Sequence, residues 1–206
     1  REQPAQSQAV TAANSVQRLE AAQTSVTQPA ASQTAATQPT VTQPPITITF
    51  SGQSAREETF SAYSRNVLKD ILRATGVSSC TITSTTRTPH DQARIFYQQL
   101  TGTLTAASYA ASGEAVKTVG RSAIKQKKSR DEVIALMEAK IRTFKPISQV
   151  SKHLADPAVL NVFDVAPSSI PAKKRAAFVN AVNADARVNK FLHPGNSTDP
   201  VYHIEV

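Results

Sequence analysis

The chain ends in Val201-Tyr202-His203-Ile204-Glu205-Val206, where polar and apolar side chains alternate from Tyr202 onward. Alternation with a period of two is typical of a β-strand, because successive side chains of a strand point to opposite faces. Such a strand would place His203 and Glu205 on one face, and Tyr202 and Ile204 on the other. The C-terminal strand is therefore expected to present a candidate metal ligand and an acid together.

Two upstream stretches supply further side chains that carry chemistry: Ser84-Thr85-Thr86-Arg87, and Ser151-Lys152-His153 followed by Phe163-Asp164-Val165. With the terminal strand they provide two histidines, one aspartate and a following acid, which is the inventory of a zinc site that keeps one position open for water. Asp164 is informative, because a carboxylate in an apolar strand is costly unless it is paired or bound to a cation. The same ligand set also occurs in non-haem iron enzymes, so ligand chemistry alone leaves the metal open.

Periodicity and turn residues predict the other elements of the folded part. Strands besides the terminal one are expected at residues 46–50, 80–84 and 161–165. Helices bounded by glycine, proline or a capping serine are expected at residues 62–74, 89–100, 129–144 and 171–186. Residues 101–120 are small and polar with weak periodicity, and neither a helix nor a strand is predicted there. The interspersed strands and helices, without regular βαβ alternation, indicate an α+β fold with a small antiparallel sheet flanked by helices.

Composition divides the chain near residue 45. Residues 1–45 are rich in Gln, Thr, Ala, Ser and Pro, so they cannot bury enough apolar surface to offset the entropy of ordering. The tripeptide Thr-Gln-Pro recurs at Thr27, Thr37 and Thr42, which indicates a semi-stiff spacer. We therefore expect a low-complexity tail or stalk over residues 1–45 and one folded domain over residues 46–206.

The formal net charge of +8 falls on the folded part, because the few charges of the tail cancel. A basic surface attracts nucleic acid, anionic lipid or acidic wall polymers. Lys125, Lys127, Lys128 and Arg130 cluster without interleaved aromatic residues, so no nucleic-acid partner is expected. The single Cys80 cannot form an intrachain disulfide, and the lack of an apolar run of about 18 residues predicts that no helix spans a membrane.

The order of these motifs resembles the zinc D-alanyl-D-alanine peptidase family. The matching positions are S-x-x-R at 84–87 with a glutamine five residues later, S-x-H at 151–153, D-V at 164–165, and aromatic-His-x-acid at 202–205. That family includes vancomycin-resistance dipeptidases and carboxypeptidases and phage L-alanyl-D-glutamate endolysins. The pattern is also similar to the metal site of the hedgehog signalling domain, which shares the fold. The resemblance spans residues 84–206 and implies a hedgehog/DD-peptidase-like fold.

The resemblance implies a role for each matching residue. The ligands of Zn²⁺ would be His153, Asp164 and His203. The substrate-binding residues would be Arg87, Ser84, Gln92 and Ser151. Arg87 would lie beside the metal and hold a substrate carboxylate or the scissile carbonyl oxygen, a catalytic role to which its fixed fork of donors is suited.

Two departures from the family pattern bear on the site. His153 and Asp164 lie eleven residues apart, wider than the usual spacing of the family, as a short loop insertion would produce. Many members carry an acid shortly before the last histidine, where this chain has Pro200 preceded by Asp199. Asp199 is the first choice for the general base. Glu205 is the second choice, although it would equally well orient the neighbouring ligand.

The sequence thus predicts a zinc-dependent peptidase that cleaves stem peptides of bacterial peptidoglycan, with carboxypeptidase and endopeptidase activity both open. A catalytic head on a tether fits a phage virion-associated lysin, whose stalk would attach to a tail or another structural protein, or an exported hydrolase of the periplasm or cell envelope. Two other classes stay open. A catalytically inactive module of the same fold would bind metal and cell wall or protein, and a basic structural or nucleic-acid-associated virion protein would need none of the ligands.

Overall fold

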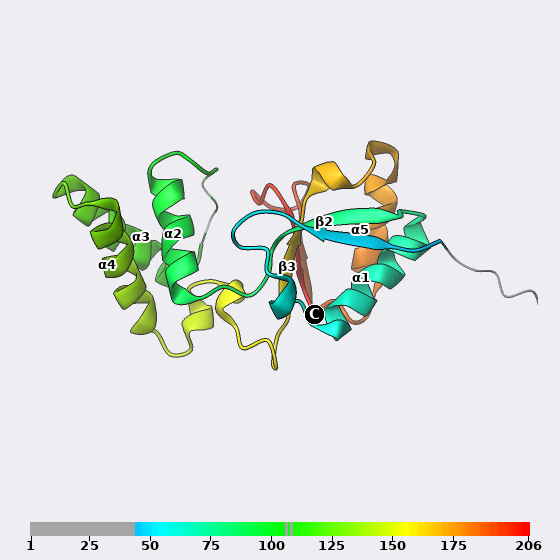
Figure 1. Cartoon of the computed structure of the whole chain (residues 1–206), viewed down its shortest axis with the longest axis horizontal. Helices are drawn as coiled ribbons and strands as arrows, with labels where there is room; N and C mark the ends of the chain where they lie inside the picture. The colour runs from blue at the N-terminus through cyan, green and yellow to red at the C-terminus, as the bar shows by residue number, and fades with distance from the viewer. Residues whose placement is uncertain (1–43, 106, 108) are drawn as a thin grey trace, which may run out of the picture. The chain divides into compact units, whose positions relative to one another are not determined.

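The computed structural model of the chain describes residues 44–105, 107 and 109–206 (Figure 1). The strands are β1 (Thr47–Phe50), β2 (Ser79–Ser84), β3 (Val162–Val165), β4 (Lys190–Leu192) and β5 (Tyr202–Glu205). The α-helices are α1 (Ala62–Thr75), α2 (Pro89–Leu100), α3 (Ala111–Lys125), α4 (Arg130–Arg142) and α5 (Arg175–Ala184). The predicted α+β class is confirmed for this part of the chain. The tail predicted for residues 1–45 lies almost wholly outside it.

The five strands form one mixed sheet in the order β1-β2-β3-β5-β4. β1 and β2 are parallel, whereas the other three pairs are antiparallel. The prediction of an antiparallel sheet is therefore wrong for one pair. The physical reason is that α1 connects β1 to β2 and carries the chain back to the end of the sheet at which β1 begins. Both strands therefore run in the same direction.

A β-bulge interrupts the pairing between β2 and β3. Ile82 lies opposite Val165, yet Ser84 lies opposite Asp164, so Thr83 is an extra residue on β2. In a regular strand without a bulge Ile82 and Ser84 would share a face, because side chains two apart in a strand point the same way. The bulge instead leaves Ile82 in the apolar core and turns Ser84 to the face that carries Asp164, as bulges beside functional sites commonly do.

One face of the sheet packs against α1 and α5, and we call these elements together the sheet region. Ser61 caps α1 by accepting a hydrogen bond from the backbone N–H of Ser64, and Gly76 ends it in the left-handed conformation with φ 64°. The core of this region is built from aliphatic and aromatic side chains of both layers. Its largest fully buried members are Phe163, Phe178, Leu68, Leu72, Ile82, Ile170 and Ile204.

The helices α2, α3 and α4 pack around a second core, and we call them the helical region (Figure 1). Capping boxes begin α2 at Thr88 and α4 at Ser129, in agreement with the starts predicted from the sequence. Helix α3 was not predicted. Its Gly120 lowers helix propensity, yet a side chain there would lie 2.5 Å from Met137 Sδ, so the glycine permits close packing of α3 on its neighbours. Tertiary contact thus overrides the weak periodicity.

Other boundaries shift by a few residues or were missed. The helix predicted for residues 129–144 ends at Arg142, and the one predicted for residues 171–186 begins as a 3-10 turn before α5. Strand β4 was missed, because it has only three residues and pairs with β5 alone. Short edge strands that carry a charge, here Lys190, leave little pattern in the sequence.

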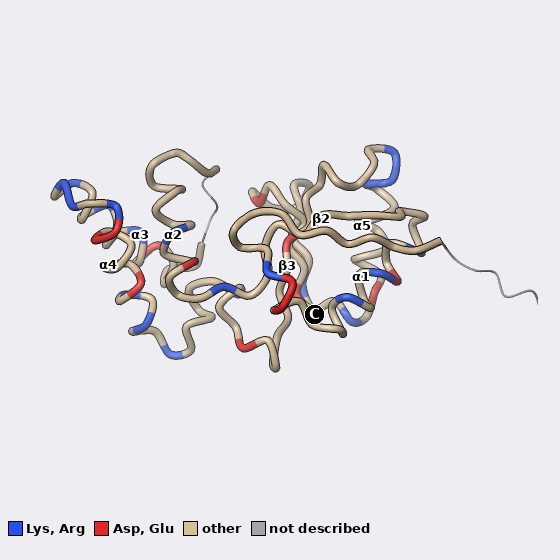
Figure 2. Tube along the Cα trace, viewed as in Figure 1, with Lys and Arg blue, Asp and Glu red and all other residues tan. Residues whose placement is uncertain are grey.

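Positive charge gathers at the turn between α3 and α4, where Figure 2 shows several Lys and Arg positions together. Lys125, Lys127, Lys128 and Arg130 are all exposed there. Cys80 lies in the core of the sheet region as a free thiol, and burial raises its pKa to about 12. None of the helices in the described residues has both the length and the apolar character that a membrane crossing requires.

Candidate metal centre

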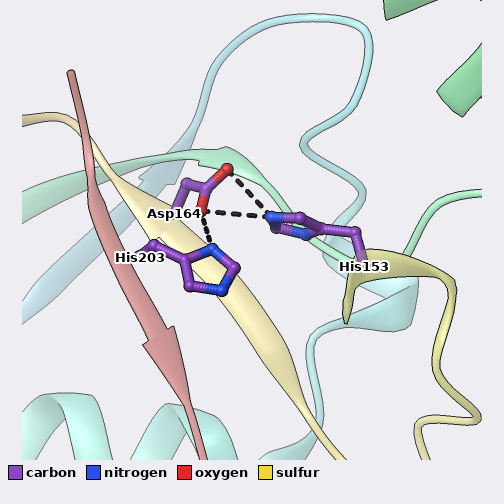
Figure 3. A group of neighbouring side chains, drawn as sticks. All are labelled: His153, Asp164 and His203. Atoms are coloured by element: carbon purple, nitrogen blue, oxygen red, sulfur yellow. Dashed lines mark hydrogen bonds and ion pairs between the residues drawn. The ribbon is translucent and has the colours of Figure 1, made fainter. Parts of the chain in front are cut away.

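The register of the sheet brings two candidate ligands together on the face opposite α1 and α5. Asp164 of β3 lies directly across from His203 of β5, and its Oδ1 is 2.9 Å from His203 Nδ1. His153 joins them from a 3-10 turn, Lys152–Leu154, with its Nε2 3.2 Å from Asp164 Oδ1 and 3.1 Å from Oδ2. Figure 3 shows both imidazoles directed at the one carboxylate. All three side chains are buried.

The turn that carries His153 is tied to the segment after β2. The backbone carbonyl of His153 accepts a hydrogen bond of 2.7 Å from the N–H of Arg87. His153 Nδ1 lies 2.8 Å from the carbonyl oxygen of Thr85, which is an acceptor only. Nδ1 therefore carries the proton, and Nε2 presents its lone pair to Asp164.

In His203 it is Nε2, rather than Nδ1, that makes the hydrogen bond fixing the tautomer. Its Nε2 lies 3.3 Å from Glu205 Oε1, and an ionised carboxylate can only accept a hydrogen bond. Nε2 therefore donates, and Nδ1 faces Asp164. A carboxylate that fixes the tautomer of a histidine in this way is a common partner of metal ligands.

The three side chains thus present lone pairs to one another. Contacts of 2.9 to 3.2 Å between such atoms require a proton or a cation between them. All three ligand atoms lie within 4.8 Å of one another. Two ligands of a tetrahedral zinc ion are separated by roughly 3.3 Å, because each bond is about 2.0 to 2.1 Å long. The donor set and its spacing therefore fit a divalent cation with at least one further position for water.

The pKa values of these groups indicate how the charge is balanced without a metal ion. Burial would lower the pKa of His203, but hydrogen bonds to Asp164 and Glu205 outweigh it and raise this pKa to about 9. Burial and the charge of Arg87 lower the pKa of His153. Although burial alone would raise the pKa of Asp164, the two histidines hold it far below its usual range. A proton on His203 therefore takes the place of a metal at one of the two imidazole–carboxylate contacts.

Arg87 lies beside this cluster, and each of its three side-chain nitrogens makes one polar contact. Nη2 is 3.4 Å from Asp164 Oδ2, Nε donates to Ser84 Oγ at 2.9 Å, and Nη1 donates to Gln92 Oε1 at 3.0 Å. Gln92 is fully buried and is not among the residues that line the neighbouring cavity. Ser84 and Gln92, which the resemblance assigns to substrate binding, thus hold the guanidinium of Arg87 in place.

A cavity of about 730 Å³ opens onto the cluster. One wall consists of the candidate ligands and the neighbouring sheet residues, and another consists of α2 and the chain that follows it. Ser151 and Asp199 also line the cavity, as the predicted roles of these two residues require. Its volume lies within the range of roughly 300–1,000 Å³ that is usual for small-molecule sites.

The two acids proposed as general base differ in surroundings. Asp199 lies between β4 and β5, half-buried, and burial together with the negative charge of Asp164 raises its pKa. Glu205 is buried, which would raise its pKa, but its hydrogen bond to His203 and the charge of that histidine lower it. Asp199 is therefore the carboxyl whose pKa moves in the direction that suits a group that both accepts and releases a proton.

Sequence reasoning missed several charged residues of the cavity. Lys190 lies across from Glu205 because β4 pairs with β5, and Arg94 lines the cavity from α2. Lys152 lines it beside the turn of His153. Only Lys152 stood inside a motif, so spacing along the sequence offered no signal for Lys190 or Arg94.

The remaining two histidines stand apart from the cluster. His90 is exposed in the first turn of α2, and its Nδ1 is 2.9 Å from Glu138 Oε2. His193 precedes the turn with Gly195, whose N–H donates to its Nδ1 at 3.0 Å.

Comparison of the chain with protein-family models, curated proteins and solved structures found no match. The resemblance to the zinc peptidase family therefore stays a prediction from the sequence. The case for a metal centre rests on the geometry of His153, Asp164 and His203.

Proposed function

We propose that this chain is a zinc-dependent peptidase that cleaves the stem peptides of bacterial peptidoglycan. One observation carries the proposal: both imidazoles have one nitrogen committed to an acceptor and direct the other at Asp164. The order of the motifs in the sequence favours zinc over iron, and the cavity beside the cluster has room for a short peptide.

A zinc ion held by His153, Asp164 and His203 would supply a Lewis acid and would lower the pKa of a bound water toward about 7. Arg87 has a fixed place beside the ligands because Ser84 and Gln92 hold its guanidinium. From there it would orient the substrate through a carboxylate or the scissile carbonyl oxygen.

Asp199 would move the proton of the hydrolysis. Its raised pKa suits a carboxyl group that takes a proton from the attacking water and gives it to the leaving amine. The oxygen of water then bonds to the carbonyl carbon while the peptide C–N bond breaks. Glu205 would act through His203, because its carboxylate accepts a hydrogen bond from the Nε2–H of that ligand.

The composition of residues 1–45 extends the proposal to the place of action. A Thr-Gln-Pro-rich tether would hold the catalytic head on a phage tail or entry apparatus, or on another structural protein of the cell envelope. The basic folded part would favour an anionic envelope in either place.

A second candidate is a catalytically inactive module that binds metal and cell wall through the same ligands. Pro200 favours it, because it stands where many members of the resembling family carry an acid. The two candidates share the metal and differ in turnover.

The experiment that tests the proposal is digestion of purified peptidoglycan by the zinc-loaded full chain, with released products followed by mass spectrometry. We expect cleavage that a chelator stops and that zinc restores. His203→Ala should abolish cleavage, whereas His90→Ala, which removes a histidine outside the cluster, should leave it unchanged. The masses of the products identify the bond that is cut.

Cleavage that persists without metal would contradict the proposal. Stoichiometric zinc binding without cleavage would favour the inactive module, and the absence of zinc binding would exclude both candidates.

A further inference from the structure

Arg94 lines the cavity from α2, and its side chain is 11% exposed. Its Nη2 donates a hydrogen bond of 3.3 Å to Ser54 Oγ and lies 4.0 Å from Asp91 Oδ1. These are the contacts that its guanidinium makes with the described residues. Most of its five donors therefore remain free for another group.

The carboxylate nearest to Arg94 is already engaged by another cation. Asp91 Oδ2 accepts a hydrogen bond of 2.6 Å from Arg56 and another of 2.7 Å from the hydroxyl of Thr88. Two guanidinium groups thus share one carboxylate, and Arg94 has the weaker share. A largely enclosed charge that has only a weak share of a counter-ion is costly, so its position favours an anion there.

The charge of the whole cavity points the same way. Four cationic side chains and three acidic ones line it, apart from the histidines. The cationic ones are Arg87, Arg94, Lys152 and Lys190, and the acidic ones are Asp164, Asp199 and Glu205. A divalent ion would add further positive charge. The cavity therefore favours a ligand that carries more than one negative charge.

The same helix carries a second polar side chain of the cavity wall. Gln99 lines the cavity, and its Nε2 donates to the hydroxyl of Tyr109 at 3.4 Å. Its Oε1 is enclosed and has no hydrogen-bond partner among the described residues. An enclosed acceptor without a partner is costly, and a turn of this side chain toward the cavity would let a peptide N–H of a ligand donate to it.

We infer that Arg94 binds a second carboxylate of the substrate, set apart from the scissile bond, so that the cavity selects acidic peptides. Arg87 serves the scissile bond beside the metal cluster, while Arg94 holds the more distant anion with Ser54 as its support. The inference rests on the proposed peptidase function for its substrate class, but its test measures binding separately from cleavage.

The test uses two synthetic peptides that are identical except at one glutamyl residue, whose free carboxylate is amidated in the second peptide. Affinities are measured by fluorescence anisotropy with the full chain, both zinc-loaded and chelator-treated. We expect the free-carboxylate peptide to bind about tenfold more tightly, because a hydrogen bond to a charged group is worth about 1.5 kcal/mol or more. The same comparison of initial cleavage rates is made with the zinc-loaded protein.

Variants then assign the preference to Arg94. Arg94→Gln should bind both peptides equally, and Arg94→Lys should keep part of the preference because it keeps the charge. Ser54→Ala should reduce the preference by freeing the guanidinium. Arg142→Gln removes an equal charge from the exposed face of α4, where Arg142 pairs with Glu138, and should keep the full preference.

Equal affinity of the unmodified chain for the two peptides would overturn the inference without recourse to any variant. A preference that survives in Arg94→Gln would overturn it as well. A preference that depends on Arg94 in a protein that cleaves neither peptide would support the inference and count against the proposed peptidase. Cleavage of both peptides without any preference would support the proposed peptidase and overturn the inference about Arg94.

Discussion

The sheet region and the helical region place their polar side chains by different means. In the sheet region, backbone pairing sets Asp164 across from both His203 and Ser84. In the helical region, Arg94 depends on the rotation of α2 and on single side-chain contacts, such as the one to Ser54. The first arrangement is held by the ladder of backbone hydrogen bonds, and the second by packing and caps.

The difference teaches where each property of the site is expected to reside. Two of the three candidate ligands lie on paired strands, and sites built on regular elements are held more precisely than sites on loops. A wall held by side-chain packing is more easily altered. Under the proposed function, chemistry belongs to the sheet region and selection of the substrate to the helical region, with the turn of His153 joining the two.

The largest effect is expected for Asp164→Ala. Without that carboxylate Arg87 loses its ion-pair partner and His203 keeps only Glu205, which should lower the free energy of unfolding of the metal-free protein by about 3–5 kcal/mol. Zinc binding should be lost as well. Urea denaturation and zinc content after gel filtration measure the two. Asp70→Ala removes an exposed carboxylate from its ion pairs and should lower the free energy of unfolding by no more than about 1 kcal/mol. Equal losses in both variants would show that Asp164 contributes no more to stability than an exposed carboxylate does.

Met137→Ala tests the other region. Met137 is fully buried between the helices, so its truncation should lower the free energy of unfolding by about 2–5 kcal/mol. Zinc affinity should stay unchanged, because no ligand belongs to that core. Denaturation and metal titration of the same sample check both statements. The neighbouring Leu136→Ala, on the exposed face of α4, should have little effect, and a loss of zinc in Met137→Ala would show that the two regions are not separable.

Glu205→Gln sharpens the comparison at one hydrogen bond. An amide can no longer attract the Nε2 proton of His203 as a carboxylate does, so zinc affinity should fall about 10–100-fold. Competition with a chelating dye measures the change. Glu138→Gln disturbs a similar acid–histidine pair in the helical region, with His90, and should leave zinc affinity as it was. Equal affinity of Glu205→Gln and the unmodified chain would remove Glu205 from the metal centre.

The pH dependence of zinc binding is expected to show the smallest effect of the four, counted for each pH unit. His203 has a pKa of about 9 in the metal-free protein, so below that pH a proton must leave before the metal binds. Apparent affinity should therefore fall by about tenfold for each pH unit below this pKa and level off above it. His153 adds no slope near neutral pH, because its pKa is lowered. Dye competition at about pH 6 to 9 gives the profile, and a flat one would show that His203 is not a ligand.

Local signals account for the parts of the fold that the sequence predicts. Helix α1 ends where Gly76 adopts a left-handed conformation, and α4 begins at the capping box of Ser129. The alternation in β5 and the apolar run around Asp164 predict two neighbouring strands. These signals act within a few residues, so they can be read without tertiary structure.

Features that arise from tertiary contact could not be predicted in the same way. The parallel pairing of β1 with β2 depends on how α1 folds back, and α3 depends on close packing at Gly120. The candidate ligands follow from motif order, but the placement of Arg94 in the same cavity follows from neither spacing nor motif. Its assignment required the arrangement of α2 against the sheet.

The bulge at Thr83 has a consequence for the engineering of this protein. The extra residue lets Ile82 face the core and Ser84 face the cavity although one residue separates them. Deletion of Thr83 would restore regular pairing and still leave Ser84 opposite Asp164, whereas a straightened strand that kept all three residues would turn Ser84 toward the core. We therefore expect this short segment to tolerate the loss of Thr83 better than a change that pairs Thr83 with Asp164 in the place of Ser84.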